Sequence, residues 1–222
     1  AFSRANGDLG LGLREIWAVS PNVIHEAVFI YSGEDDVTNS ATDTVGIDVL
    51  DAFEGGSAGR KSAQTNRNYH FSNLFWREGP RVTFKAGAEI THERSSSVSQ
   101  DDFAGLFTFS SLADYEAGRP LTYRVTQGDP FLEVDQTEVG AFVQADWHVN
   151  RRFTLFTGLR YGRQSMVDDS DNVDPRLGFA YSLGASTIDR GGAGLFHQDV
   201  DLFLIEEVVR VDGARQHEVI IS

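Results

Sequence analysis

The sequence contains no cysteine among its 222 residues. It therefore has no disulfide framework, no thiolate metal site and no cysteine nucleophile. It also lacks any run of about 18 apolar residues, which excludes a transmembrane helix. The mean hydropathy of −0.27 does not count against a membrane-spanning barrel, because barrel strands alternate apolar and polar residues.

Basic residues are scarce, with 19 Lys and Arg against 33 Asp and Glu, so the net charge is −14. This balance argues against a nucleic-acid partner, which needs clustered Lys and Arg. Most of the acids fall in polar stretches such as 35–54, 101–102 and 168–171. We interpret these stretches as solvated loops.

Signatures of catalysis and metal binding are also missing. The six histidines are dispersed, with no HExxH pair, no GxSxG elbow and no P-loop. Paired acids such as Glu206-Glu207 would point to opposite faces of a strand. Alternating oxygen ligands at 168–174 resemble a calcium loop, but Val173 stands where an EF-hand needs glycine. We predict no enzymatic activity, no metal and no cofactor.

Apolar residues recur at every second position over most of the chain, which predicts strands with one apolar and one polar face. In residues 81–92, Val82, Phe84 and Ile90 share one face, while small or polar residues such as Gly87 occupy the other. Residues 139–149, 153–162 and 176–183 repeat the pattern. The predicted fold is all-β and antiparallel.

Each of the three tryptophans, Trp17, Trp76 and Trp147, lies a few residues before a tight polar turn. Indole rings prefer the boundary between hydrocarbon and water. Repetition at one height predicts a membrane-interface girdle. Three core tryptophans of a soluble β-domain would give the same spacing.

Short and long connections alternate strictly along the chain. Short turns fall near 21–22, 79–80, 150–152 and 185–186, and long polar segments near 35–66, 95–130, 165–174 and 199–222. Outer-membrane barrels have tight periplasmic turns and long extracellular loops. We therefore predict about eight membrane-crossing strands in four hairpins. Both ends of the chain interrupt the pattern, so we expect residues 1–222 to be part of a larger barrel.

Charged residues on the predicted polar face would line the lumen of such a barrel. They are expected to pair across the inner wall or to meet a plug, and they are Lys85, Glu89, Asp146, Arg160, Arg176 and Arg190. The last stretch, 201–222, is predicted to form two β-rich runs around Asp212-Gly213.

Several segments together resemble one family. Residues 105–120 (GLFTFSSLADYEAGRP) are similar to an extracellular loop of TonB-dependent outer-membrane receptors. The strand motifs FVQADW at 142–147, TLFTGLRY at 154–161 and PRLGFAY at 175–181 follow in the order and spacing of that family. The resemblance covers most of 67–222 and, more loosely, 11–33. The nearest branch is the large type with a carboxypeptidase-regulatory-like N-terminal domain.

This resemblance implies a 22-stranded barrel plugged by an N-terminal domain, which imports a scarce ligand through the TonB system. The chain would supply wall and extracellular loops only, and no ligand-binding residue can be transferred to it. The implied partners are outer-membrane lipid, a plug domain, the TonB system and a small ligand, with carbohydrate among the candidates. The alternative is a soluble, acidic all-β binding module such as a carbohydrate-binding sandwich.

Overall fold

The computed structural model describes residues 2–40, 43–168, 170–210, 212 and 215–222. Eight strands form one large antiparallel sheet in the order β1-β2-β5-β6-β9-β10-β11-β12. The five longest have 18 or 19 residues each: β1 (Phe2–Ser20), β2 (Val23–Ser40), β5 (Lys61–Glu78), β6 (Val82–Ser99) and β9 (Phe131–His148). The other three are shorter: β10 (Phe153–Gln164), β11 (Val173–Ser182) and β12 (Ile188–Gly194).

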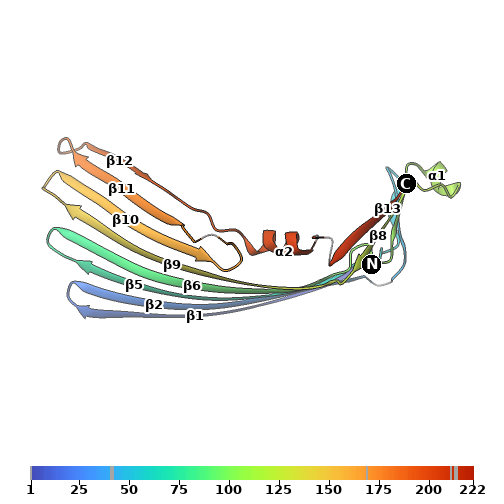
Figure 1. Cartoon of the computed structure of the whole chain (residues 1–222), viewed down its shortest axis with the longest axis horizontal. Helices are drawn as coiled ribbons and strands as arrows, with labels where there is room; N and C mark the ends of the chain where they lie inside the picture. Colours follow the sequence, from blue (N-terminus) through green and yellow to red (C-terminus); the bar gives the residue numbers. More distant parts are fainter. Residues whose placement is uncertain (1, 41–42, 169, 211, 213–214) are drawn as a thin grey trace.

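Four hairpins with short turns build this sheet, as the alternating pattern predicts. The turns join β1 to β2, β5 to β6, β9 to β10 and β11 to β12, and all four lie at the same end of the sheet (Figure 1). β1 and β12 form the two edges. Closure of the sheet into a barrel, and the number of strands that cross a membrane, stay predictions.

The strands are inclined to the line of short turns. One row of directly paired residues crosses seven strands: Trp17, His25, Phe75, Ala86, Val143, Leu159 and Pro175. The row begins about four residues from the first short turn and ends about ten residues from the last. The row therefore shifts by about six residues, at ~3.3 Å per residue, across six strand spacings of ~4.8 Å. This shift corresponds to a strand tilt of roughly 35°. Barrel walls have this tilt.

A second sheet lies at the far end of the molecule, opposite the short turns (Figure 1). Its order is β13-β8-β7-β3-β4. The strands are β3 (Gly46–Val49), β4 (Phe53–Gly55), β7 (Leu106–Phe109), β8 (Thr122–Gly128) and β13 (Gln216–Ile221). We call it the distal sheet. β3 and β7 come from two different long loops and pair in parallel.

The distal sheet has a small core of its own. Val49 and Phe109 are 1% and 7% exposed. The ring of Phe109 meets that of Tyr115 edge-on, with 5.2 Å between the ring centroids. Phe107 packs against Tyr123 with 4.6 Å between centroids. The predicted long loops 35–66 and 95–130 are therefore folded, and the strands of the large sheet extend into both of them.

A short helix, α1 (Leu112–Glu116), is fixed at its N-terminus by hydrogen bonds. Ser110 and Ser111 donate their hydroxyls to Asp114, and Arg119 donates to it as well. These bonds, Ser110 first, lower the pKa of Asp114 to about 2. Because the pKa is lowered in the folded state, this stabilisation is complete above the ordinary pKa and is lost as the pH falls through about 2.

The prediction of a β-rich run after Asp201 is wrong. Residues Leu202–Arg210 form helix α2. Asp201 caps it, since its carboxylate accepts from the Phe203 amide at 2.8 Å, and Glu206 pairs with Arg210 one turn later. The predicted turn at Asp212-Gly213 lies partly outside the described residues. The final strand β13 does form, but it pairs with β8. Among the described residues no helix has the length and hydropathy needed to span a bilayer.

Candidate membrane face and polar-face cavity

One face of the large sheet is apolar and open to the surroundings. We call it the apolar face; it carries the row Leu13, Phe29, Phe71, Ile90 and Val139, whose members are directly paired and so point the same way. Leu13 is 61% exposed, Val143 48% and Leu177 58%. Large apolar side chains in such numbers mark a surface that meets lipid or protein. The opposite side is called the polar face.

The apolar face forms a band of constant width. On each of seven strands it spans nine residues: 9–17, 23–31, 69–77, 82–90, 139–147, 153–161 and 173–181. The side chains on this face are mainly apolar, and the polar exceptions within these limits are Glu15, His25, Asn73, Arg77 and Thr157. Eight intervals of ~3.3 Å at a tilt of roughly 35° give a height of about 22 Å. The apolar band of outer-membrane barrels is about 25 Å tall.

Charged pairs lie on the same side just beyond this band. Arg67 bonds both carboxylate oxygens of Asp35, at 3.0 and 3.1 Å. Arg94 contacts Glu133 at 2.5 Å and Asp135 at 3.6 Å. The ion-paired residues begin two residues past the band on β5 (Arg67) and four residues past it on β2 and β6 (Asp35 and Arg94), and they set the upper limit of the band.

All three tryptophans lie at the short-turn end of the sheet, but they do not share a face. Trp17 and Trp147 are on the apolar face and are 60% and 50% exposed. Trp76 pairs with Lys85 on the polar face, and the Lys85 ammonium lies 5.1 Å from its ring centroid. The sequence pattern groups Trp76 with Trp17 and Trp147, but the pairing with Lys85 places it on the opposite face. The pattern is ambiguous here because residues 67–76 contain apolar side chains on both faces.

The opposite rim of the band carries tyrosines that were not singled out from the sequence. Tyr31 and Tyr69 lie on the apolar face with their ring centroids 5.1 Å apart. Tyr161 occupies the same height on β10. Tyr31 and Tyr161 each follow a short turn by nine residues, counted from Asn22 and Arg152. That constant interval was a signal available in the sequence. Aromatic residues at both rims are typical of membrane barrels.

The six charged residues expected at the lumen all lie on the polar face: Lys85, Glu89, Asp146, Arg160, Arg176 and Arg190. Two of them come together, since Arg160 donates to Glu89 at 2.5 Å. Arg176 lies 3.8 Å from Asp174 and 4.7 Å from the Phe196 ring centroid. Asp146 accepts from Gln144 at 3.0 Å. Their exposure to a lumen stays a prediction.

The chain after β12 returns across the polar face. His197 bonds Asp174 through both its backbone amide and its ring nitrogen, at 3.1 and 2.6 Å. Gln164 bonds both backbone groups of Val200, each at 2.9 Å. Bonding of this kind fixes residues 195–200 against β10 and β11. Asp174 and His197 therefore belong to this attachment, and within the described residues no group of three or more His, Asp or Glu side chains is placed to hold a metal ion.

Helix α2 continues this attachment over β6. Glu206, which is 5% exposed, accepts from the Ser95 hydroxyl at 3.1 Å and also from the Ser97 hydroxyl. Arg210 donates to Glu206 at 2.8 Å and to Ser97 at 2.6 Å. The buried carboxylate is thus surrounded by donors.

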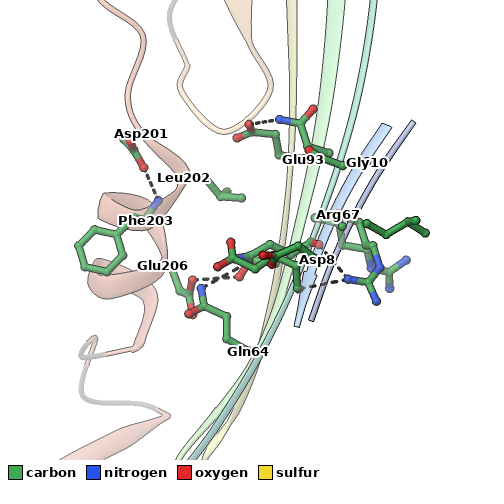
Figure 2. A pocket seen from close by; sticks show the side chains of 17 residues that line it. Asp8, Gly10, Gln64, Arg67, Glu93, Asp201, Leu202, Phe203 and Glu206 are labelled. Atoms are coloured by element: carbon green, nitrogen blue, oxygen red, sulfur yellow. Dashed lines mark hydrogen bonds between the residues drawn. The ribbon is translucent and has the colours of Figure 1, made fainter. Parts of the chain in front are cut away.

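A cavity of about 650 Å³ separates α2 from the polar face of β1, β2, β5 and β6 (Figure 2). Leu202 points from the helix toward the strands, and Gln64 and Glu93 point from the strands toward the helix. The cavity begins just past the apolar band on β2, β5 and β6. Its size suits a small-molecule ligand.

Residues 4–172 match the family model described as an outer membrane beta barrel domain. The matched segment is well over half of the chain. The chain belongs to this family. A search of the curated proteins finds no match.

As an outer membrane beta barrel domain, the chain is located in the outer membrane. The sequence-based prediction of an outer-membrane location is thereby confirmed, and the alternative of a soluble binding module is set aside. The exposed apolar face receives its physical explanation from this location, since it can be covered by lipid.

Proposed function

We propose that this chain forms wall and extracellular loops of a TonB-dependent outer-membrane transporter that imports a scarce small ligand. The observation that carries the proposal is the two-faced sheet, apolar over one band and charged on the other side. The motifs at 142–147, 154–161 and 175–181 support the TonB-dependent type, because all three lie on consecutive wall strands β9, β10 and β11.

In the proposed orientation the short turns face the periplasm and the distal sheet faces the outside. Tight turns on one side and long loops on the other are the arrangement of outer-membrane barrels. The loop segments 43–60 and 100–130 fold into the distal sheet, together with β13. Import, and not catalysis, is the proposed role of the whole protein.

Single cysteines can test this orientation, because the chain has none of its own. Ala113→Cys lies on α1 beside the distal sheet, and Arg151→Cys lies in the β9–β10 turn. A membrane-impermeant maleimide should label position 113 on intact cells, and position 151 only after the outer membrane is permeabilised. Labelling of position 151 on intact cells, with position 113 protected, would reverse the orientation.

A plug domain is the second part of the proposal that can be tested. Arg190 is an exposed residue of the polar face on β12, opposite Ala180. A photo-crosslinking amino acid at position 190 of the full-length protein in cells should form a link to the plug, identified by mass spectrometry. The control is position 177 on the apolar face, where no link to the plug is expected. Equal capture from both positions would count against a plug on the polar side.

A further inference from the structure

A second hollow lies on the polar face, where β10, β11 and β12 run side by side. Its volume is about 420 Å³. Its floor is formed by six residues in two directly paired rows: Phe156, Gly178 and Gly192, then Gly158, Arg176 and Gly194. Because four of these six residues are glycines, we call the site the glycine hollow.

The floor of the glycine hollow is bare backbone. The three atoms nearest to a Cβ atom built at Gly192 all belong to the backbone of Leu177 and Gly178. A Cβ atom at Gly158 would meet the Val143 carbonyl oxygen at 3.6 Å and the Arg176 Cβ atom at 3.9 Å. Strands ~4.8 Å apart and same-face residues ~6.6 Å apart give an open floor of roughly 10 by 7 Å. A flat ring system can lie against the sheet there, since glycine lets a ligand approach the backbone closely.

Two phenylalanines border this floor. The Phe156 ring lies beside Gly178, with its Cδ2 atom 3.7 Å from the place of a Cβ atom at that glycine. The Phe196 ring lies beside Gly194 in the same way, at 3.3 Å. Phe156 is 37% exposed and Phe196 71%, so both rings have surface left for a further contact. Aromatic rings favour stacked and edge-to-face contacts with another ring.

Arg176 supplies the charge of the glycine hollow. Among the described residues that line the hollow, it alone is charged. Its guanidinium lies 4.7 Å from the Phe196 ring centroid, a cation–π contact that favours this position. The Asp174 carboxylate is 3.8 Å away, too far for a hydrogen bond, and its Oδ1 atom bonds His197 instead.

The N–H groups of Arg176 are therefore available. Within the described part of the chain, its guanidinium donates no hydrogen bond. A guanidinium has five N–H donors in a planar fork that matches a carboxylate. Free donors beside an apolar, flat-floored hollow favour a ligand with a carboxylate on an apolar body.

The glycine hollow lies halfway across the apolar band. Gly158 and Arg176 are directly paired, and each is next to the central residue of its nine-residue segment, 153–161 or 173–181. Because the two faces of a strand alternate, the hollow is on the side away from the apolar face. A ligand would reach it along the inner wall of the barrel and not from the lipid.

We propose that the glycine hollow binds a flat aromatic carboxylate. The ring of the ligand would lie on the glycine floor against Phe156 and Phe196, and its carboxylate would accept two hydrogen bonds from Arg176. The inference deepens the proposed transport function by naming a ligand class for the inner wall, and it rests on that function for access through the lumen. Binding itself requires only the folded sheet.

Isothermal titration of the full-length protein in detergent, corrected for detergent alone, tests this with three probes that share one ring system. Indole-3-acetate, indole-3-acetamide and tryptamine are anionic, neutral and cationic. We expect the acetate to bind at least about tenfold more tightly than the acetamide, and tryptamine not to bind. The affinity of the acetate should fall as salt is raised. Equal affinity for the acetate and the acetamide would overturn the proposal.

A fourth probe, cyclohexylacetate, carries the same charge on a ring that is not flat. It should bind more weakly than indole-3-acetate, and equal affinity would overturn the assignment of an aromatic body. A segment of the full-length protein seated in the hollow would abolish binding of all four probes, and this result would also overturn the proposal.

Arg176→Gln removes the charge and keeps most of the side-chain length. It should weaken binding of indole-3-acetate about tenfold or more and leave binding of the acetamide unchanged. Arg190→Gln is the matched control, because Arg190 lies on the same face, opposite Ala180, and does not line the hollow. It should bind the acetate as the parent does, and unchanged acetate affinity in Arg176→Gln would contradict the assignment.

Gly158→Val tests the floor, since its side chain would fill the hollow without meeting another atom closer than ordinary van der Waals contact. It should weaken binding of the acetate and the acetamide alike, by about tenfold or more. Gly162→Val is the control on the same face of β10, where a Cβ atom meets nothing within 4 Å, and it should bind as the parent does. Equal affinities in these two variants would place the ligand elsewhere.

The binding test and the orientation test fail separately. Predicted labelling of positions 113 and 151, with no preference for the acetate, would refute the glycine hollow as a binding site and leave the transport proposal intact. Reversed labelling with intact acetate binding would count against the transport proposal alone.

Discussion

Replacement of Val143 by lysine is expected to disfavour insertion of the sheet into the outer membrane by about 2–4 kcal/mol. Val143 is the central residue of the 139–147 segment of the apolar band, and its side chain is 48% exposed. A lysine there would place an ammonium near the middle of the hydrocarbon layer. Folding into lipid vesicles, followed by the heat-dependent shift on gels, measures the loss.

Gln144→Lys is the matched control, one residue along the same strand and on the polar face. Lys85 lies directly opposite, but Asp146 lies two residues away on the same face. The cost of this substitution should stay below about 1 kcal/mol. Equal losses for both variants would refute the assignment of the two faces.

Gly87, also on the polar face, is not a suitable control, although the sequence pattern places it among the small and polar residues of that face. A Cβ atom at this position would lie 2.6 Å from the Phe142 ring and 2.8 Å from the Asn73 carbonyl oxygen. Phe142 is paired with Gly87 and covers it. Phe142 is thus an apolar residue on the polar face of β9, where the space above Gly87 accommodates its ring.

The second large effect is expected for Glu206→Ala. The substitution would leave the Arg210 guanidinium, whose side chain is 12% exposed, without its carboxylate and would remove an acceptor from Ser95 and Ser97. Breaking a buried ion pair from one side costs about 3–5 kcal/mol. Helix α2 should therefore separate from β6, which hydrogen exchange of amides 202–210 would show.

Glu207→Ala provides the comparison for this experiment, because Glu207 is the exposed neighbour on the same helix. Its exchange pattern should match that of the parent protein. If Glu206→Ala also left exchange of 202–210 unchanged, the contacts with Ser95 and Ser97 would not be what holds α2 on the sheet.

The large sheet could be predicted from the sequence because the patterns that define it involve residues close together in the chain. Alternation along a strand depends on neighbouring residues, so the apolar face from Val82 to Ile90 could be assigned from the sequence alone. The short turns were equally local, as at Pro21-Asn22. Ambiguity arose at Trp76, where apolar residues occur on both faces, and there only the register with Lys85 decides.

The parts that were missed depend on partners distant in sequence. Residues 202–210 contain valines and isoleucine that suit a strand, but the Asp201 cap and the Glu206–Arg210 pair favour a helix once Ser97 supplies a contact. The parallel pairing of β3 with β7 joins residues about sixty positions apart. The cavity likewise requires β1 and α2, which come from opposite ends of the chain.

The pairing of β3 with β7, and of β8 with β13, has a consequence for how this protein can change. Three chain segments that leave the large sheet at separate places share one hydrogen-bonded sheet. None of these segments can lengthen, shorten or swing outward without breaking the backbone hydrogen bonds that pair it with another segment. We therefore expect insertions to be tolerated at the hairpin tips, such as 50–52, while the segments themselves vary together as a single recognition surface.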